Sequence, residues 1–516
     1  MRQLSRRDLL KLSLAALGGA AAARLAPFAA RNPSNGRPNI LLLVFDALSA
    51  RHMSLYGYAR ATTPNLEAFA ETAAVYHDHY SAGSFTTPGT ASILTGLEPW
   101  HHRAVALSSP VKRSLSDNNI FRLGRGEYTR IGFAQNLLAD VFLRQFHRDL
   151  DLRLPAQSFS YGNPLLIERL NPSDPLAYFA FDDFLVGGFK FDTPYSGSAM
   201  LGVMDRILRR GVTRHPEIKG RLRAEVCFNG YFYYQNRVLF DGIFNTLKKA
   251  ATGDRPYLGY FHFWSPHEPY FPTPEFTGLF RDGRRAVEKP EHPFAPAYLH
   301  TAQQLTQLQT AYDQYIANVD AEFGRLMDSM SAAGMLENTC VIVLADHGQL
   351  FERGVHGHAS RLLYEGVLRT PLLIRLPGQT RRVDVRTPTS NVDLLPTLAS
   401  IMGVASDLQT DGQLLPGLGG VEVPQRSLFS VNAAENSAFL PLTTGAFALI
   451  KGTRKFLLYT GYAGLDDRAE LYDLAEDPDE LRDLSRADPA AAKQMRDELL
   501  AARDAADRAV LSADRK

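Results

Sequence analysis

Near-continuous apolar runs, each only a few residues long, constrain the fold of this chain more than any other feature. They read ILLLVFDAL at 40–48, YLGYFHFW at 257–264, CVIVLAD at 340–346 and TPLLIRLP at 370–377. Such runs are typical of strands that are buried on both faces, and these occur in largely parallel sheets covered by helices. The sequence therefore predicts a large sheet at the centre of an α/β domain.

The segments between these runs have helical patterns. We expect helices at 64–74, at 301–334 and at 391–403, where Gly403 is a typical C-terminal residue. Strands that alternate with helices in this way predict a doubly wound α/β domain, with helices on both faces of the sheet, over residues 37–404.

Two regions depart from this alternation. Residues 145–250 are rich in Phe, Tyr and Gly and are interpreted as an insertion that shapes a pocket. From about residue 405 the short pieces SLFSV, FALIKGT, KFLLYT and AELYDL are separated by turn signals. They predict a small antiparallel sheet, closed by a helix at 488–508, so that 405–516 forms a C-terminal α+β subdomain.

Charge and cysteine content exclude several classes of protein. The 516 residues carry 56 basic and 55 acidic side chains, a net charge of +1, which gives no electrostatic reason to bind nucleic acid or an anionic membrane surface. The two cysteines, Cys227 and Cys340, are too few for a disulfide framework. Cys340 lies in an apolar run and is expected to be a buried free thiol, although a bridge between the two stays open.

The N-terminus has the pattern of an export signal. Arg6 and Arg7 are followed by Leu9 and by a weakly apolar run rich in Ala and Leu. Residues 1–30 resemble a twin-arginine signal, which implies export of the folded protein by the twin-arginine machinery to the periplasm or outside the cell. An uncleaved signal would bring the protein close to a membrane. The alternative is an amphipathic N-terminal helix in a cytoplasmic protein.

Polar residues with metal-binding potential follow three of the predicted strands. Asp46 ends the first strand, Asp346 and His347 end the strand at 340–346, and His267 follows the strand at 257–264. Ligands of open α/β sheets collect beyond the carboxyl ends of the strands, and carboxylates with imidazoles bind divalent cations. Taken singly, these aspartates could be cap or turn residues and His267 could pack between prolines.

The stretch SFTTPGTASILTG at 84–96 combines hydroxyl side chains with a helix start. Pro88 is typical of the first helical turn, so Thr86 is expected just before a helix N-terminus, where backbone N–H groups favour anions. A metal beside it would lower the pKa of its hydroxyl and make it a nucleophile toward phosphorus or sulfur. The alternative is a simple cap, worth about 1 kcal/mol.

Several collinear segments resemble the sulfatase family of the alkaline-phosphatase superfamily. They include TTPGTASILTG, SPHEPY, VIVLADHGQLFERGVHGH and NVDLLPTLASIMG, and the resemblance covers most of 38–100 and 257–485. It implies an alkaline-phosphatase-like mixed sheet with a small C-terminal subdomain, and one divalent metal (Ca, Mg, Mn or Zn). The implied roles are as follows: the metal is held by Asp46, Thr86, Asp346 and His347, while His267, His356 and His358 contact the substrate, with His267 and His358 also taking part in catalysis.

The chain departs from the family at its nucleophile. Sulfatases carry Cys or Ser in Cys/Ser-x-Pro-x-Arg, which is converted to formylglycine, but here Thr86 and Thr90 stand at the first and last positions. No formylglycine is therefore expected. Phe45 stands where the family often has a second aspartate, and Gln135 and Leu137 stand where it has Lys and His. Related phosphoethanolamine and glycerol-phosphate transferases use a metal-bound threonine, which Thr86 resembles.

These observations favour a metal-dependent hydrolase that attacks a sulfate or phosphate ester through Thr86. The ester would belong to a small molecule, a glycan or a lipid. Three alternatives stay open: a phosphoryl-group transferase, a hydrolase in which Thr86 is only a ligand and water attacks directly, and a non-catalytic binding protein on the same fold.

Overall fold

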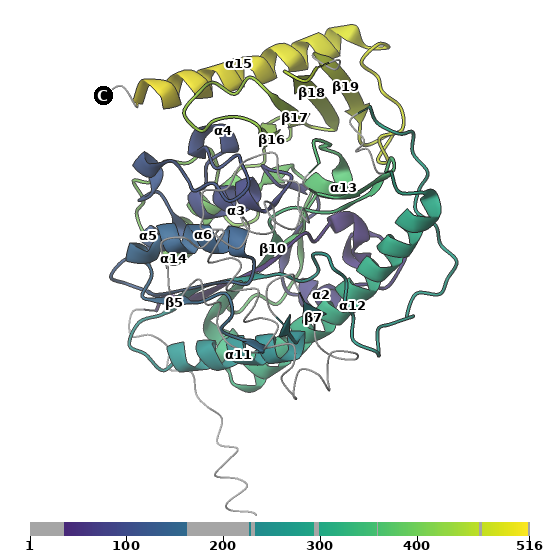
Figure 1. Ribbon diagram of the computed structural model, residues 1–516. Helices are drawn as coiled ribbons and strands as arrows, with labels where there is room; N and C mark the ends of the chain where they lie inside the picture. Colours follow the sequence, from purple (N-terminus) through teal and green to yellow (C-terminus); the bar gives the residue numbers. More distant parts are fainter. Residues whose placement is uncertain are drawn as a thin grey trace, which may run out of the picture.

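A mixed sheet between two layers of helices forms the larger part of the molecule (Figure 1). The computed structural model describes residues 36–161, 227–228, 233–293, 299–358, 360–463 and 467–513. The eight strands lie in the order β14-β2-β13-β10-β1-β9-β4-β5, and of these described strands only β13 is antiparallel to its neighbours. They are β1 Asn39–Phe45, β2 Ala74–Tyr76, β4 Thr129–Ala134, β5 Leu152–Leu154, β9 Tyr257–Phe263, β10 Thr339–Ala345, β13 Leu372–Arg375 and β14 Val383–Val385.

Strand β1 lies near the centre of this sheet, and all seven of its residues are buried. It pairs in parallel with β10 on one side and with β9 on the other, so that Phe45 lies beside both Ala345 and Phe263. Parallel neighbours in this register end at the same edge of the sheet. Asp46 and Asp346, the next residues along their chains, are therefore brought together by backbone pairing alone.

Each face of the sheet carries its own helices, because successive side chains of a strand point to opposite faces. Figure 1 shows α2, α11 and α12 on one face and α3, α5, α6 and α14 on the other. The apolar side chains of each group belong to a separate buried cluster, one on each face of the sheet. The helices are α2 Pro64–Ala70, α11 Asn236–Ala250, α12 Ala302–Ala332, α3 Thr86–Thr95, α5 Ile120–Leu123, α6 Leu137–Gln145 and α14 Leu394–Met402.

Shorter elements join these layers. They are the strands β3 His79–Tyr80, β6 Ser160–Tyr161, β7 Cys227–Phe228, β8 Tyr233–Tyr234, β11 Leu350–Glu352, β12 Val355–Gly357 and β15 Thr389–Ser390, the helices α4 Pro99–His102 and α13 Glu365–Leu368, and 3-10 turns at Ala50–His52, Ser54–Tyr56, Arg113–Leu115, His147–Asp149, Met335–Asn338 and Asn391–Asp393.

Two of the sequence expectations need different boundaries. The helix expected at 64–74 ends at Ala70, because residues 74–76 pair with β13 as strand β2. The range 145–250 is not all insertion, since β5 extends the main sheet and α11 packs into its core. Residues 162–226 lie outside the described residues, so the pocket role expected for this region stays a prediction.

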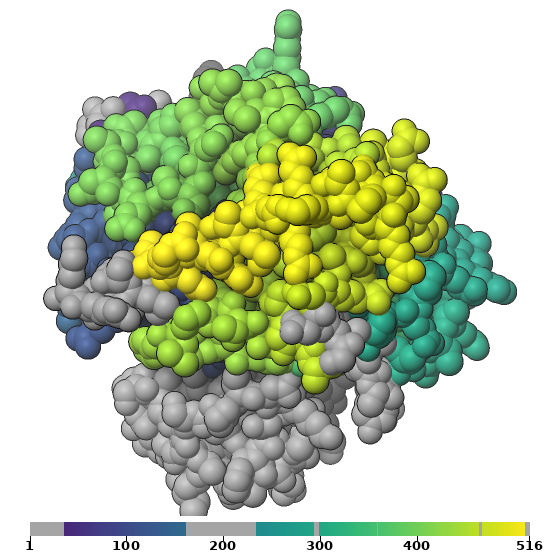
Figure 2. Space-filling model, turned by 90° about the horizontal axis from the view of Figure 1, so that it is seen from above, coloured from purple at the N-terminus to yellow at the C-terminus, as the bar shows by residue number. Residues whose placement is uncertain are grey.

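The C-terminal subdomain is an antiparallel sheet covered by one long helix. Strands β16 Ser427–Asn432, β17 Gly445–Lys451, β18 Arg454–Thr460 and β19 Arg468–Asp473 pair in chain order, and α15 Pro489–Ala513 packs on one face. Figure 2 shows α15, in yellow, lying across this end of the molecule. The residues just after 405 still belong to the large domain: Leu415 lies in its core, and the Tyr76 hydroxyl donates to the Pro416 carbonyl.

A buried ion cluster attaches this subdomain to the large domain. Lys455 Nζ of β18 lies 3.1 Å from Glu365 Oε1 of α13 and 2.9 Å from Glu480 Oε1. Burial raises the pKa of Glu480 to about 7, although Lys455 opposes this rise. Helix α13 in turn accepts backbone hydrogen bonds from Gly348 and Gln349 (2.7 and 2.9 Å), the residues that follow His347. The subdomain thus supports a segment that begins at the end of β10.

None of the described helices is both long and apolar enough to cross a membrane. The expected export signal at 1–30 lies outside the described residues. Within the described part of the chain, Cys340 is a buried and unbridged thiol in β10, as its apolar run predicted.

Replacing the buried lysine should destabilise the protein strongly. Lys455→Met leaves the carboxylates of Glu365 and Glu480 buried without their cation, at a cost of about 3–5 kcal/mol. The pKa values of both carboxyls should rise in the variant. As pH falls toward about 5 the carboxyls take up protons, so the loss in free energy of unfolding relative to the wild type should become smaller. The matched control is Lys451→Met, since Lys451 pairs with Glu498 at the surface, where a pair is worth about 0–1 kcal/mol.

Thermal unfolding of the three proteins at one scan rate, repeated from pH 8 to pH 5, measures this difference. Equal unfolding midpoints for the two variants would contradict a stabilising role of the buried ion cluster. A loss of stability in Lys455→Met that becomes larger at low pH would contradict it as well.

Candidate active site

Two aspartates and a histidine meet at the carboxyl ends of β1 and β10. His347 Nε2 lies 3.4 Å from Asp46 Oδ1 and 3.6 Å from Asp346 Oδ2, and all three side chains are fully buried. The sequence predicted these residues as a ligand set, and the structure brings them together.

Backbone contacts fix the orientation of this group. Asp346 Oδ1 accepts hydrogen bonds from the backbone N–H groups of His347 (2.9 Å) and Ala47 (3.3 Å). His347 Nδ1 donates to the Gly348 carbonyl at 2.8 Å. A histidine whose Nδ1 donates in this way directs Nε2 at its other neighbours, and a donating Nδ1 is the usual arrangement of a metal-bound imidazole.

Thr86 lies beside the same group. Its Oγ1 is 3.4 Å from His347 Nε2 and accepts a hydrogen bond from Asn136 Nδ2 at 3.2 Å. The same amide nitrogen donates to Asp46 Oδ2 at 2.5 Å, so Asn136 joins the hydroxyl to the carboxylate. Thr86 is the first residue of α3 rather than the residue before it, because Phe85 occupies the N-cap position. The hydroxyl and the helix N-terminus therefore both face the site.

Close packing brings α3 against the end of β10. A Cβ atom on Gly89 would lie 2.3 Å from the Asp346 carbonyl oxygen, so only glycine allows this approach. Ser81 Oγ donates to the same carbonyl at 2.5 Å. The family arginine is replaced by Thr90, which is buried within α3. The arrangement fixes the distance between Thr86 and the two aspartates through rigid elements rather than through a loop.

The two carboxylates affect each other's charge. Burial raises the pKa of Asp46, but the charge of His267 and contacts with His262 and His347 lower it by more, so that it lies well below its ordinary value. Burial and the neighbouring Asp46 raise the pKa of Asp346. Burial lowers the pKa of His347, yet the two carboxylates raise it to about 9. The group thus places two carboxylates side by side in a buried position, an arrangement that a bound cation would stabilise.

His267 and His358 extend from the buried group toward the surface. The His358 ring stacks on His347 with centroids 4.4 Å apart and meets the His267 ring at 4.6 Å. Both side chains are half-buried. His267 Nδ1 donates to the Glu268 carbonyl at 2.5 Å, and His358 Nδ1 donates to Gln349 Oε1 at 2.6 Å. In both rings Nε2 is thus the nitrogen that can act on a substrate.

His356 lies in a neighbouring network. Its Nε2 is 2.8 Å from the Tyr270 hydroxyl, 3.0 Å from Glu268 Oε2 and 3.3 Å from Gln349 Nε2. The structure places the two histidines differently: His358 contacts His347 and His267, whereas His356 contacts the residues around them. The substrate contact expected for His356 stays a prediction.

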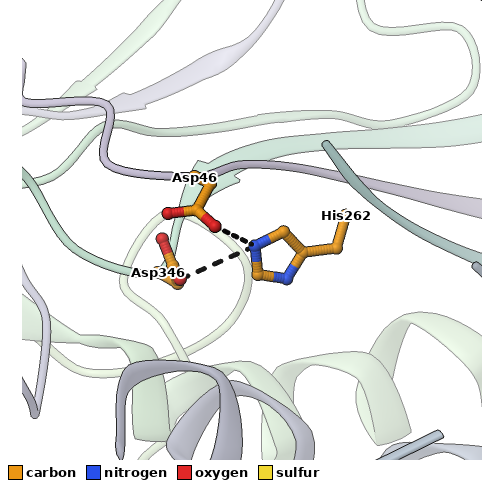
Figure 3. A group of neighbouring side chains, drawn as sticks. All are labelled: Asp46, His262 and Asp346. Carbon is orange, nitrogen blue, oxygen red and sulfur yellow. Dashed lines mark ion pairs between the residues drawn. The ribbon is translucent and has the colours of Figure 1, made fainter. Parts of the chain in front are cut away.

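Two residues of the site were missed in the sequence. Asn136 stands between Gln135 and Leu137, the positions compared with the family's Lys and His, and neither neighbour supplies a cation. Gln135 Oε1 instead accepts from the Trp264 N–H at 3.0 Å. His262 lies inside the apolar strand β9, and its Nε2 is 3.4 Å from Asp46 Oδ2 and 3.6 Å from Asp346 Oδ2 (Figure 3). The sequence did contain a signal for His262, because it is a single histidine near the end of an otherwise apolar strand.

The donor atoms suit a divalent cation. Asp46 Oδ1, Asp346 Oδ2 and His262 Nε2 are buried and have no hydrogen-bond partner among the described residues. Buried polar atoms rarely remain unpaired, since each costs roughly 1–3 kcal/mol. Their ligand atoms all lie within 4.8 Å of one another, and Figure 3 shows the imidazole nitrogen directed between the two carboxylates. Carboxylate oxygens and imidazole nitrogens are ligands of divalent metals.

Comparison with known proteins agrees with this site. The model of the Sulfatase family matches residues 38–404, most of the chain. The chain belongs to the sulfatase family. A second model, described as N-sulphoglucosamine sulphohydrolase, C-terminal, matches residues 354–505. As a sulfatase-family member the chain is an ester hydrolase, and a divalent-metal site is characteristic of the family.

The relatives of this sulfatase-family chain are distant in sequence but similar over nearly their whole length. It is 24% identical to choline-sulfatase of Rhizobium meliloti over 477 residues, which are 88% of this chain and 83% of the relative. It is 26% identical to human arylsulfatase A, with 86% and 82% covered. Phosphonate monoester hydrolase from Silicibacter pomeroyi has a similar fold, with a TM-score of 0.64, 19% identity, and 92% and 97% covered.

Proposed function

We propose that this chain hydrolyses anionic sulfate or phosphate esters with Thr86 as its nucleophile and with a divalent cation held by Asp46, Asp346 and His347. One observation carries the proposal. The Thr86 hydroxyl lies 3.4 Å from His347 Nε2, at the N-terminus of α3 and beside two buried carboxylates. A bound cation would lower the pKa of this hydroxyl and offset the negative charge of the ester oxygens.

Other side chains of the site orient the nucleophile, bind the ester oxygens and protonate the leaving group. Asn136 donates to Thr86 Oγ1 and orients the hydroxyl oxygen (3.2 Å). The N–H groups at the start of α3 face the same place and favour the non-bridging oxygens of the ester. His267 Nε2, on the half-buried side of the site, is assigned as the proton donor to the leaving oxygen, and His358 as a second contact to the ester.

The reaction proceeds in two displacements. Thr86 Oγ1, after releasing its proton to solvent, forms a bond to sulfur or phosphorus, while the bond from that atom to the leaving oxygen breaks. The leaving oxygen takes a proton from His267 and departs as an alcohol. Water then attacks the same sulfur or phosphorus, returns a proton to His267 and displaces Thr86 Oγ1. Sulfate or phosphate is released, and Thr86 Oγ1 takes back a proton from solvent, which restores the starting state.

The relatives suggest the class of substrate. They include a choline-sulfatase, an arylsulfatase and a phosphonate monoester hydrolase. We therefore place the substrate among small-molecule or glycan esters, with sulfate, phosphate and phosphonate esters as the compounds to compare. Because Thr86 stands at the position of the family's Cys or Ser, we propose that formylglycine is not used.

Removal of the Thr86 hydroxyl should abolish turnover. Thr86→Ala is expected to lower kcat/KM by about 10⁴-fold or more, because the nucleophile is lost, whereas Thr86→Ser keeps a hydroxyl and should keep measurable activity. The matched control is Thr87→Ala, in the same helical turn, because the Thr87 hydroxyl accepts a hydrogen bond from the Ser108 backbone N–H and has no assigned role in the reaction. A panel of sulfate, phosphate and phosphonate esters, assayed with metals varied, measures this.

Two further readouts separate the mechanisms. Mass spectrometry of rapidly quenched turnover should find a sulfo or phospho group on Thr86 in the wild type. Full activity of Thr86→Ala would rule out covalent catalysis by this residue. If the modified enzyme passes its group to added alcohols faster than to water, the protein is a transferase rather than a hydrolase.

We also propose that the enzyme acts in the periplasm or outside the cell. The support is the order of Arg6, Arg7 and the apolar Ala/Leu run in residues 1–30. A reporter enzyme fused to residues 1–30 should appear in the periplasm of a bacterium with a twin-arginine system, and Arg6→Lys together with Arg7→Lys should hold it in the cytoplasm. Export that persists in a strain lacking the twin-arginine system would contradict this route.

A further inference from the structure

Among the described strands of the large sheet, His262 is the one histidine. It belongs to β9, pairs in register with Val44 of β1, and is fully buried among apolar neighbours of the strand. Its Nε2 lies 3.4 Å from Asp46 Oδ2 and 3.6 Å from Asp346 Oδ2 and has no hydrogen-bond partner among the described residues. A buried nitrogen that faces two carboxylates and has no other partner on that side has the position of a metal ligand.

We propose that His262 Nε2 is a direct ligand of the cation, and that it makes the site selective for a transition metal that accepts nitrogen ligands, such as Zn²⁺ or Co²⁺, over Ca²⁺ and Mg²⁺. This inference rests on the proposed function, because it concerns the same metal site.

The position before Asp46 supplies no ligand. The Phe45 ring stacks on Phe263 with centroids 4.9 Å apart, so this position belongs to the apolar core and offers no oxygen. His262, the residue before Phe263 on the strand beside β1, directs its Nε2 to Asp46 and Asp346. The neighbouring strand therefore supplies a donor atom that β1 does not.

A second contact holds the ring in the orientation of a ligand. His262 Nδ1 lies 3.0 Å from the Tyr260 hydroxyl, two residues earlier on the same face of β9. With Nδ1 engaged there, Nε2 is the nitrogen directed at the carboxylates. Metal-bound histidines almost always have such a partner on the other ring nitrogen, and losing it typically costs 10–100-fold in metal affinity, in order of magnitude.

The resulting donor set has a chemical preference. It combines the imidazoles of His262 and His347 with the carboxylates of Asp46 and Asp346 and the hydroxyl of Thr86. Ca²⁺ and Mg²⁺ are bound almost entirely by oxygen, whereas imidazole suits Zn²⁺ and neighbouring transition metals. Two nitrogen donors in one small site therefore favour the latter group.

The test compares metal binding by the full chain and by matched variants. After chelator treatment, the affinities for Zn²⁺ and Ca²⁺ are measured by competition with a fluorescent chelator. His262→Gln should lose more than about 100-fold in Zn²⁺ affinity. This exceeds the loss expected for a residue that only hydrogen-bonds to a metal ligand and does not touch the metal itself. Its Ca²⁺ affinity should change little. His262→Asp should shift the preference toward Ca²⁺. The control His79→Gln, at another fully buried histidine, should bind both metals as the wild type does.

X-ray absorption of the Zn²⁺-loaded proteins gives a readout independent of activity and of stability. The wild type should show two imidazoles on the metal and His262→Gln one. One imidazole in both proteins, with equal Zn²⁺ affinity and intact ester hydrolysis, would overturn the ligand role and leave the proposed function standing. A wild type that hydrolyses no ester and binds no divalent cation would overturn both.

Discussion

The carboxylates of Asp46 and Asp346 lie side by side without access to water, and the rest of the site depends on this pairing. Parallel register between β1 and β10 places them there, since each follows directly on paired residues of the two strands. Two buried negative charges repel each other unless positive charge comes between them. The imidazoles of His262 and His347 and the amide of Asn136 surround the pair and meet part of this demand. A divalent cation would neutralise the remaining charge. It would remove the repulsion between the two carboxylates and would activate the Thr86 hydroxyl.

Different parts of the fold position the residues around these two carboxylates. The α3 layer carries the hydroxyl, and the absence of a side chain at Gly89 lets the helix start lie against the end of β10. The C-terminal subdomain acts through Lys455 and α13, which holds the segment after His347 by backbone hydrogen bonds. A small sheet that contributes no ligand of its own can therefore affect the precision of the site.

The sequence allowed the sheet and most residues of the candidate site to be named in advance, for a clear physical reason. Long apolar runs identify buried strands, and a polar residue that ends such a run has to lie at the edge of the sheet, so Asp46, Asp346 and His347 could be grouped from their positions in the chain. Thr86 was found because Pro88 marks a helix start. His262 could not be assigned in this way, because its contact with Asp46 follows from the register of β9 against β1, which the pattern of one strand does not contain. Asn136 was missed for the related reason that helix α6 and strand β4 set its direction jointly.

The most direct test of the account is a crystal structure of the metal-loaded protein with vanadate, which adopts the geometry of a sulfuryl or phosphoryl group under attack. The account predicts vanadium bonded to Thr86 Oγ1, and an anomalous signal from a single divalent metal in contact with both Asp46 and Asp346. Vanadate bound away from Thr86, or a metal that leaves the two aspartates without contact, would contradict it.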